Sequence, residues 1–225
     1  MSPRPIGGDL DPPRDVASLR ARAHALAGHT LAELANSRGR ALPADLRRHK
    51  GFVGRLLEAA LGAPEDSAEG PDFARLGVEL KTLPINPSGR PAESTFVCRA
   101  QLARMPELDW ERSNVCEKLR HVLFVPIEAE GELGERRVGA AFEWIPSAAE
   151  DAVLRADYER AAELLARGEL EQLTAHLGEA LQIRPKAASG REVTLGPSGD
   201  AHTWTRPRGF YLRARFTAQL IDARR

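Results

Sequence analysis

Lysine is rare in this sequence of 225 residues. Of its 32 basic side chains only four are lysines, Lys50, Lys81, Lys118 and Lys186, and the others are arginines. A lysine ammonium is a compact charge whose pKa moves readily, whereas a guanidinium is planar and stays protonated. Each lysine in a chain that otherwise uses arginine is therefore a candidate for a position where arginine could not do the same chemistry.

Long apolar runs and cysteine patterns are also absent. No stretch approaches the 18 apolar residues that a membrane helix needs, and the segment MSPRPIGGDLDPPR lacks the hydrophobic region of a signal peptide. We therefore expect a cytoplasmic protein with no membrane partner. The two cysteines, Cys98 and Cys116, lack the spacing of zinc ligands, so the sequence indicates neither a disulfide framework nor a zinc site.

Net charge is lacking too, because 32 acidic side chains balance the 32 basic ones. This balance argues against a protein that coats nucleic acid by bulk attraction. Residues 181–225, however, hold nine Lys and Arg against three Asp and Glu, while residues 1–180 hold 23 against 29. A basic C-terminal segment can supply phosphate contacts and an acidic remainder can hold metal, although a solvated basic face has the same composition.

The order of apolar patterns predicts a mixed α/β domain. Residues 1–14 contain four prolines and are expected to form a mobile tail. Apolar residues at helical spacing predict helices in 15–28, 30–39, 51–63 and 146–173, with a last helix from 217. Runs rich in Val, Ile, Phe and Thr predict strands in 78–84, 94–102, 121–129 and 136–145, which we expect to form one sheet, and two further strands in 180–190 and 206–216.

The stretch PDFARLGVELKT, residues 71–82, brings two acids and a lysine together. In a strand, Glu79 and Lys81 point to the same face, and Asp72 converges with Glu79 if the chain reverses at Gly77. Two converging carboxylates favour a divalent cation, and Mg²⁺ commonly takes one or two protein carboxylates and several waters. The alternative is a solvent-facing edge strand with alternating charges.

Other candidate residues lie outside that stretch. Glu58 is at the border of an apolar helical stripe, where a carboxylate can face either a cleft or water. Arg184 and Lys186, two apart on a predicted strand, can reach guanine edges or phosphates from one face, and Tyr211 can place its ring against a base. Phe96 could wedge between bases, but a phenylalanine in STFVC is more typical of a core.

The segments KGFVGRLLEAALG, DFARLGVELKTLPI, GRPAESTFVC, KLRHVLFVPIE, RRVG, LQIRPKAA and RPRGFYLRARFT closely resemble the MutH family, in the same order and at similar spacings. This family comprises strand-nicking endonucleases of methyl-directed DNA mismatch repair. The resemblance runs from about Leu19 to the last helix. It implies a restriction-endonuclease-like core, with a mixed sheet flanked by helices and two lobes that form a DNA-binding cleft. One nuclease domain would span 15–225, with the metal site in an N-terminal lobe of about 15–110 and DNA recognition in a C-terminal lobe of about 111–225.

The resemblance also assigns roles to individual residues. The catalytic set of the family falls on Asp72, Glu79, Lys81, Glu58 and Lys118, with Asp72 and Glu79 as metal ligands. The DNA-binding set falls on Lys50, Glu93, Phe96, Arg184, Lys186 and Tyr211. All four lysines of the chain thus coincide with functional positions of the family. Two features depart from its pattern, namely Glu117 beside Lys118 and a loop at 187–205 that looks shortened.

The function implied is a Mg²⁺-dependent endonuclease that nicks the unmethylated strand at hemimethylated GATC sites. Such an enzyme acts on double-stranded DNA as a monomer, is activated by the ATPase MutL, and depends on MutS indirectly. The sequence has no G-x-x-x-x-G-K loop, which fits dependence on another protein for the ATP-linked signal. Two alternatives stay open: a dimeric restriction endonuclease that cuts unmethylated GATC, and a non-catalytic DNA-binding module.

Overall fold

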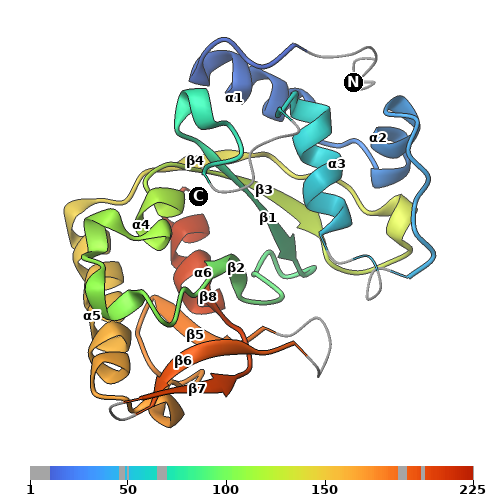
Figure 1. Ribbon diagram of the computed structural model, residues 1–225. Coiled ribbons are helices and arrows are strands. Elements are labelled where there is room, and N and C mark those ends of the chain that lie inside the picture. Colours follow the sequence, from blue (N-terminus) through green and yellow to red (C-terminus); the bar gives the residue numbers. More distant parts are fainter. Residues whose placement is uncertain are drawn as a thin grey trace. The chain divides into compact units, whose positions relative to one another are not determined.

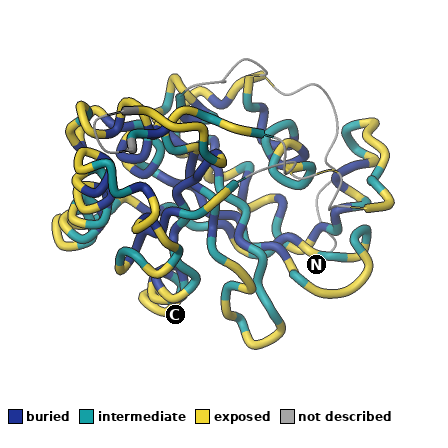
Figure 2. Tube along the Cα trace, turned by 60° about the horizontal axis from the view of Figure 1, so that its bottom comes forward, coloured by how far each residue is buried: buried dark blue, intermediate teal, exposed yellow. Residues whose placement is uncertain are grey.

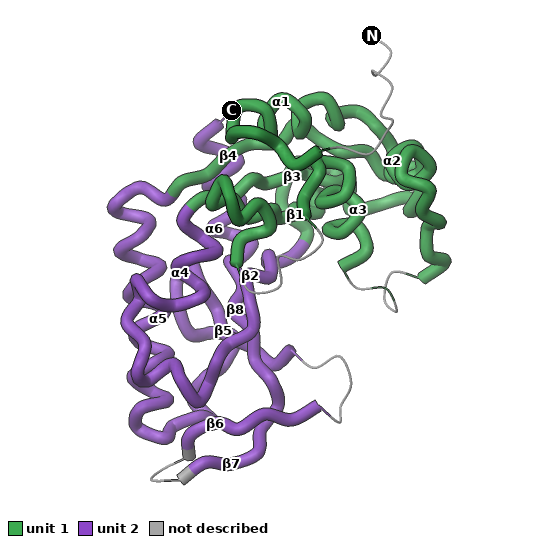
Figure 3. Tube along the Cα trace, turned by 45° about the horizontal axis from the view of Figure 1, so that its top comes forward, with its two compact units in different colours: residues 1–92, 121–145 green, residues 93–120, 146–225 purple. Residues whose placement is uncertain are grey.

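The protein was analysed as a computed structural model that describes residues 11–45, 49, 51–64, 70–186, 192–198 and 201–224. The chain divides into two compact units, each made of two separate segments (Figure 3). The first unit comprises Met1–Ala92 and His121–Ile145, and the second comprises Glu93–Arg120 and Pro146–Arg225. The sequence predicts two lobes that are each one continuous segment and meet near residue 110. In the structure, each unit combines two segments.

The described residues of the first unit form three α-helices and a three-stranded sheet (Figure 1). Its helices are α1 (Val16–Ala25), α2 (Leu31–Ser37) and α3 (Phe52–Leu61), and its strands are β1 (Glu79–Ile85), β3 (Val122–Glu128) and β4 (Phe142–Trp144). The sheet order is β1-β3-β4, with β1 and β3 parallel and β4 antiparallel to β3. The mixed sheet and its flanking helices confirm the predicted α/β class.

Local sequence signals set the ends of these helices. The hydroxyl of Thr30 accepts a hydrogen bond from the backbone N–H of Glu33, and the Glu33 carboxylate accepts one from the backbone N–H of Thr30. This capping box satisfies two backbone donors that the first turn of α2 leaves open. Helix α3 ends at Gly62, whose φ of 82° lies in the left-handed region that glycine adopts without strain.

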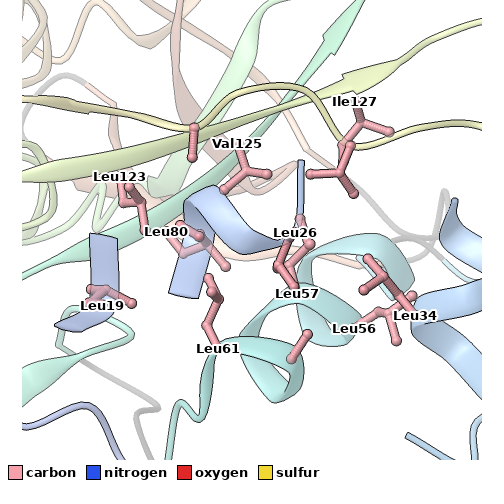
Figure 4. Close-up of a cluster of buried hydrophobic side chains, with 14 of the residues drawn as sticks. Leu19, Leu26, Leu34, Leu56, Leu57, Leu61, Leu80, Leu123, Val125 and Ile127 are labelled. Carbon is pink, nitrogen blue, oxygen red and sulfur yellow. The ribbon is translucent and has the colours of Figure 1, made fainter. Parts of the chain in front are cut away.

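A hydrophobic core joins the helices to the sheet within the first unit (Figure 4). Helix α3 contributes Leu56, Leu57 and Leu61, all at 0% exposure, and Leu80 of β1 packs against the same cluster. Burial of each such side chain contributes about 1.5–3 kcal/mol to stability. One face of β1 is therefore fixed in the core, and its other face carries Glu79 and Lys81.

The second unit contains an antiparallel sheet of order β2-β8-β5 and a separate hairpin, β6-β7. Its strands are β2 (Thr95–Arg99), β5 (Leu181–Pro185), β6 (Thr194–Ser198), β7 (Ala201–Thr205) and β8 (Arg208–Leu212). The prediction of one sheet for 78–145 was wrong, because β2 pairs with β8 rather than with β1 or β3. The segment expected as a loop at 187–205 contains the hairpin.

Three helices belong to the second unit: α4 (Asn114–Leu119), α5 (Ala148–Ala166) and α6 (Ala214–Asp222). Helix α5 begins with a capping box between Ser147 and Glu150, as predicted, and buries Leu154 and Tyr158. It ends at Ala166 rather than near residue 173, because Gly168 at φ 70° turns the chain. Buried positions gather along the strands, and exposed ones gather on outer helices and loops (Figure 2).

Short 3₁₀ turns complete the chain: η1 (Ala74–Leu76), η2 (Met105–Glu107), η3 (Trp110–Arg112), η4 (Leu133–Glu135) and η5 (Leu170–Gln172). Both cysteines are buried free thiols. Within the described part of the chain, no helix combines the length and the hydrophobicity that crossing a bilayer requires.

Candidate functional site

The turn between Asp72 and Glu79 is closed by its own backbone. The N–H of Phe73 donates to the carbonyl of Val78 at 2.9 Å, and η1 fills the space between them. Gly77 ends the turn at φ 65°, a conformation that a side chain disfavours. The predicted reversal at Gly77 is confirmed, and it brings Asp72 back to the first residues of β1.

Backbone hydrogen bonds hold both carboxylates at the start of β1. The N–H of Leu80 donates to Oδ2 of Asp72 at 2.8 Å, and the N–H of Asp72 donates to Oε2 of Glu79 at 3.3 Å. The N–H of Glu79 in turn donates to the carbonyl of His121, the residue just before β3, at 2.9 Å. The two acids are therefore positioned by main-chain atoms, which move less than side chains do.

Lys81 makes an ion pair with the carboxylate that is most deeply buried. Its Nζ contacts Oε1 of Glu79, and the side chains of Lys81 and Glu79 are only 12% and 2% exposed. A buried carboxylate is costly unless a partner compensates its charge. The alternative of a solvent-facing strand edge is therefore wrong for Glu79, because its side chain lies inside the protein.

Glu58 on α3 faces the same carboxylates. Burial raises the pKa of Glu58, and the negative charges of Asp72 and Glu79 raise it further, while Arg55 and Lys81 act in the opposite direction. The Glu58 side chain is half-buried, and its carboxyl lies close enough to the two acids to feel their charge. Three acids from α3, the turn and β1 concentrate negative charge in one place.

The donor set fits a hard divalent cation. Carboxylate oxygens are the ligands that Mg²⁺ prefers, and a cation would relieve the repulsion that raises the pKa of Glu58. Across the described residues, no group of three or more His, Cys, Asp and Glu side chains is arranged to hold a metal ion on its own. Asp72 and Glu79 would supply two ligands, the number that Mg²⁺ commonly takes from protein.

A second group of predicted residues comes together in the second unit. The rings of Phe96 and Tyr211 meet edge to face, with centroids 5.3 Å apart and planes at 64°. The guanidinium carbon of Arg184 lies 3.9 Å from the centroid of Tyr211, and Nζ of Lys186 lies over the ring of Phe96. We call Phe96, Arg184, Lys186 and Tyr211 the aromatic–cation cluster.

Phe96 does not belong to the core, contrary to the expectation from its residue type. It is half-buried, and a β-bulge separates it from Cys98 in the pairing of β2 with β8. A bulge re-aims side chains, which places Phe96 opposite Tyr211. No local pattern predicts the bulge, because it depends on pairing with a strand more than a hundred residues away.

Gly209 leaves the space that this cluster occupies. A Cβ at this position would lie 2.9 Å from Cε2 of Phe96, 3.2 Å from the carbonyl of Cys98 and 3.4 Å from Cδ of Lys186. Any larger residue would displace the phenylalanine ring. Gly209 is a functional candidate that sequence reasoning missed, although its place in RPRGFYL, two residues before Tyr211, offered a signal.

Asp157 on α5 fixes the start of the strand that carries Arg184. Its carboxylate accepts hydrogen bonds of 2.7–2.9 Å from the consecutive backbone N–H groups of Glu179, Ala180 and Leu181. Gly178 precedes them at φ 87°, where a Cβ would collide with the carbonyl oxygen of Leu181 and lie 3.0 Å from Cγ of Asp157. Sequence reasoning missed Asp157 because it reads as one of many polar positions on the outer side of α5.

Arginines hold the carbonyls of the same loop. Arg213 donates to the carbonyls of Ala175 and Leu177 at 2.9 Å each, and Arg215 donates to the carbonyl of Glu179 at 3.0 Å. Burial lowers the pKa of Arg213. Asp157 binds backbone N–H groups of the loop before β5, and Arg213 and Arg215 bind its carbonyls. These contacts together fix the conformation of the loop.

For Glu93 and Lys118, two of the remaining predicted residues, the structure gives their position and exposure. Glu93 is exposed just before β2, and Lys118 lies half-buried on α4, both in the second unit. Their predicted roles stay predictions. Glu117 beside Lys118 is exposed, and Lys50 lies outside the residues that the structure describes.

The amino-acid sequence of the chain matches a known family of proteins. The family model for the DNA mismatch repair enzyme MutH matches residues 61–157, which include Asp72, Glu79 and Lys81. A DNA mismatch repair protein MutH of Shewanella baltica (strain OS195) is 47% identical over 214 residues, which cover 94% of this chain and 96% of that protein. Proteins of the same name from Shewanella sp. (strain ANA-3) and Shewanella oneidensis are 47% and 46% identical over the same coverage. The chain, with its converging carboxylates and its aromatic–cation cluster, belongs to the MutH family of DNA mismatch repair enzymes.

Proposed function

We propose that the protein is a Mg²⁺-dependent endonuclease of mismatch repair, which nicks the unmethylated strand of DNA at hemimethylated GATC sites. The observation that carries the proposal is the convergence of Asp72, Glu79 and Glu58 on the side of β1 that also bears Lys81, in a member of the MutH family. A restriction-endonuclease-like core follows from this membership. The work of such an enzyme on chromosomal DNA favours a cytoplasmic location.

Asp72 and Glu79 would hold the metal, and each is already fixed by the backbone. When bound, Mg²⁺ would stabilise negative charge on the phosphodiester and acidify an attacking water. Lys81 orients that water and stabilises charge that develops at the phosphate, because its ammonium lies against Glu79 at the edge of the site. Glu58 adds negative charge beside the two ligands and so increases the attraction of the site for a divalent cation.

Recognition of the GATC site is assigned to the aromatic–cation cluster together with Glu93 and Lys50. Arg184 and Lys186 donate to guanine edges or phosphates, and the Tyr211 ring contacts the methylated adenine. The stacking of both cations on rings supports this assignment, because it holds their donor groups in place before DNA arrives. Partners in the proposal are MutL as the direct activator and MutS as the mismatch sensor that acts through it, and the enzyme works as a monomer.

The test is a nicking assay with Mg²⁺ on plasmids whose GATC sites are unmethylated, hemimethylated or fully methylated, with and without MutL. We expect nicks confined to the unmethylated strand, a rate that rises with MutL, and loss of all cutting with EDTA. Prompt linearisation without MutL would indicate the dimeric restriction enzyme. Binding without cutting under every condition would indicate the non-catalytic module and would refute the proposal.

A further inference from the structure

The β6-β7 hairpin turns its large apolar side chains to the solvent. Leu195 and Trp204 are 43% and 68% exposed, and Val193, two residues before Leu195, is 55% exposed. The register pairs Leu195 directly with Trp204, so both side chains lie on the same face of the hairpin. We call Val193, Leu195 and Trp204 the outward face.

The opposite face of the hairpin contacts the second unit around Gly196. A Cβ built on Gly196 would lie 3.5 Å from Cδ1 of Leu102 and 3.5 Å from Cδ2 of Leu170, both of which are buried. Thr205 lies on this side as well, 3.1 Å from the same point. The hairpin therefore packs with small and polar residues inward and with Trp204 outward, the reverse of the usual pattern of a sheet with one solvated face. A cluster of large apolar side chains left exposed in this way is typical of a contact surface.

The base of the hairpin is hydrogen-bonded to the chain just after β5. The backbone N–H of Lys186 donates to the carbonyl of Pro207 at 2.7 Å, and Pro207 lies two residues after the end of β7. β8, with Tyr211, begins at the next residue. The outward face is thus part of the same sheet-and-hairpin assembly as Arg184 and Lys186.

The described charges of the hairpin itself leave room for a polyanion. Among the described residues of 192–206, the single acid is Glu192, and its carboxylate is bound to Nη1 of Arg99 at 2.6 Å. Arg206 and His202 are exposed on the same stretch. No uncompensated negative charge in this described stretch would oppose a phosphate backbone.

We propose that the outward face of the hairpin contacts duplex DNA beside the recognition site, with Trp204 and Leu195 packed against deoxyriboses and Arg206 against a phosphate. This inference rests on the proposed function and extends it to a surface that recognises no sequence. A protein partner fits less well, because stable protein interfaces use about 20–30 residues a side, whereas this face offers three large side chains, two of them on five-residue strands and one just before β6. A face of this size is sufficient for DNA, because it only adds to the DNA contacts proposed for Lys186.

Trp204 provides its own probe. The chain has three tryptophans, of which Trp110 and Trp144 are each 2% exposed and Trp204 is 68% exposed. Acrylamide quenching of the intrinsic fluorescence therefore reports mainly on Trp204. The experiment titrates the full protein with a duplex that carries a central GATC and long flanks, with Ca²⁺ in place of Mg²⁺ to limit cutting. Anisotropy of a labelled copy of the duplex measures binding in parallel.

We expect DNA to protect Trp204, so that quenching of the complex falls towards that of the Trp204→Thr variant. That variant keeps a residue suited to a strand, and we expect it to bind the duplex about fivefold more weakly. The loss should be the same for a GATC duplex and for a random one, because contacts with sugars and phosphates carry no sequence information. Thr203→Ser, a change at the exposed neighbour on the other face, should leave the affinity unchanged.

Two results would overturn the inference in different ways. If anisotropy shows binding while Trp204 stays as open to acrylamide as in the free protein, the hairpin does not contact DNA, and the proposed function stands. If no duplex binds at all, the proposed function fails and the inference fails with it. An unchanged affinity of Trp204→Thr for DNA, combined with a loss of stimulation by MutL, would assign the face to a protein and likewise reject DNA as its occupant.

Discussion

The two units differ in how deeply they bury the side chains to which we assign functions. In the first unit, Glu79 is 2% exposed and is paired with Lys81, so charges are buried and held by backbone hydrogen bonds. In the second unit, Tyr211 and Phe96 are half-buried, and Trp204 is mostly exposed. Hydrolysis needs charges whose positions do not relax, because electrostatic stabilisation is strongest where water is excluded. Recognition needs side chains that a large ligand can reach, even though their exposure forgoes the free energy of burial.

The largest effect is expected where the first unit depends on a compact charge. Lys81→Arg should lower nicking about 10³-fold while DNA affinity stays largely intact, because a planar guanidinium cannot take the place of an ammonium against Glu79. The matched control is Arg75→Lys, which makes the reverse exchange at an exposed position of the same turn and should leave nicking unchanged. If Lys81→Arg still nicks DNA, a compact ammonium is not required against Glu79. The contrast between a buried charge in the first unit and accessible side chains in the second would then lose its functional meaning.

A second variant tests whether β5, the strand that carries Arg184, also depends on a fixed scaffold. Asp157→Ala deprives three consecutive backbone N–H groups of their acceptor and should lower the free energy of unfolding by about 2 kcal/mol. For a chain of this length the melting temperature should fall by about 4–8 °C. Thermal unfolding followed by circular dichroism measures this shift. Glu159→Ala, at an exposed position on the same helix, is the control, and an equal loss there would mean that the carboxylate of Asp157 does not stabilise the loop.

The third prediction separates recognition from simple attraction to phosphate. Lys186→Ala should weaken binding to a GATC duplex about tenfold and affect random DNA less, because it removes a donor that reads base edges. Lys50→Ala should reduce GATC selectivity less. Competition binding at one fixed salt concentration gives both ratios. If Lys186→Ala weakens binding to the GATC duplex and to the random duplex equally, this lysine contacts phosphate and does not read bases.

The smallest expected effect comes from the repulsion between acids in the first unit. Glu58→Gln removes a carboxylate whose pKa is raised by burial and by Asp72 and Glu79, so the metal-free protein should melt about 2 °C higher at neutral pH. Because the pKa is raised on folding, the protonated form of Glu58 favours the folded state at low pH, and this stability is lost as the pH rises through the raised pKa. The advantage of Glu58→Gln should therefore vanish below pH 4.5, the ordinary value for this group.

Melting curves in EDTA across this pH range measure the difference. Addition of Mg²⁺ at neutral pH should reverse its sign, because bound metal stabilises the wild-type carboxylates more than the variant. A gain that is independent of pH would show that the charge of Glu58 is not the cause.

Local signals in the sequence predicted the parts of the fold that depend on neighbours along the chain. The capping boxes at Thr30 and Ser147, the end of α3 at Gly62 and the reversal at Gly77 each involve residues only a few positions apart. Asp72, Glu79 and Lys81 could be named for the same reason, since the turn and strand that join Asp72 to Glu79 are local. The role of Glu58, on a separate helix, came only from the family resemblance.

Features that depend on distant partners could not be predicted. The sequence places Thr95–Arg99 in a strand, but nothing in those five residues says that β8 rather than β1 is the neighbour. The sequence predicts a loop at 187–205, where the structure has the β6-β7 hairpin, whose large apolar residues face outward and do not pack on a core. Gly209 and Asp157 act through contacts with residues far along the chain, which makes them visible only after folding.

The division of each unit into two segments bears on how the protein is made. The strands and helices of the first unit are all present once residue 145 has left the ribosome, so this unit can fold while synthesis continues. β2 has to wait, because Thr95 pairs with Leu212, near the end of the chain. Until then its unpaired edge, with Phe96 and Val97, is open to other strands. Synthesis rate and chaperones should therefore affect the yield of the folded second unit more than that of the first.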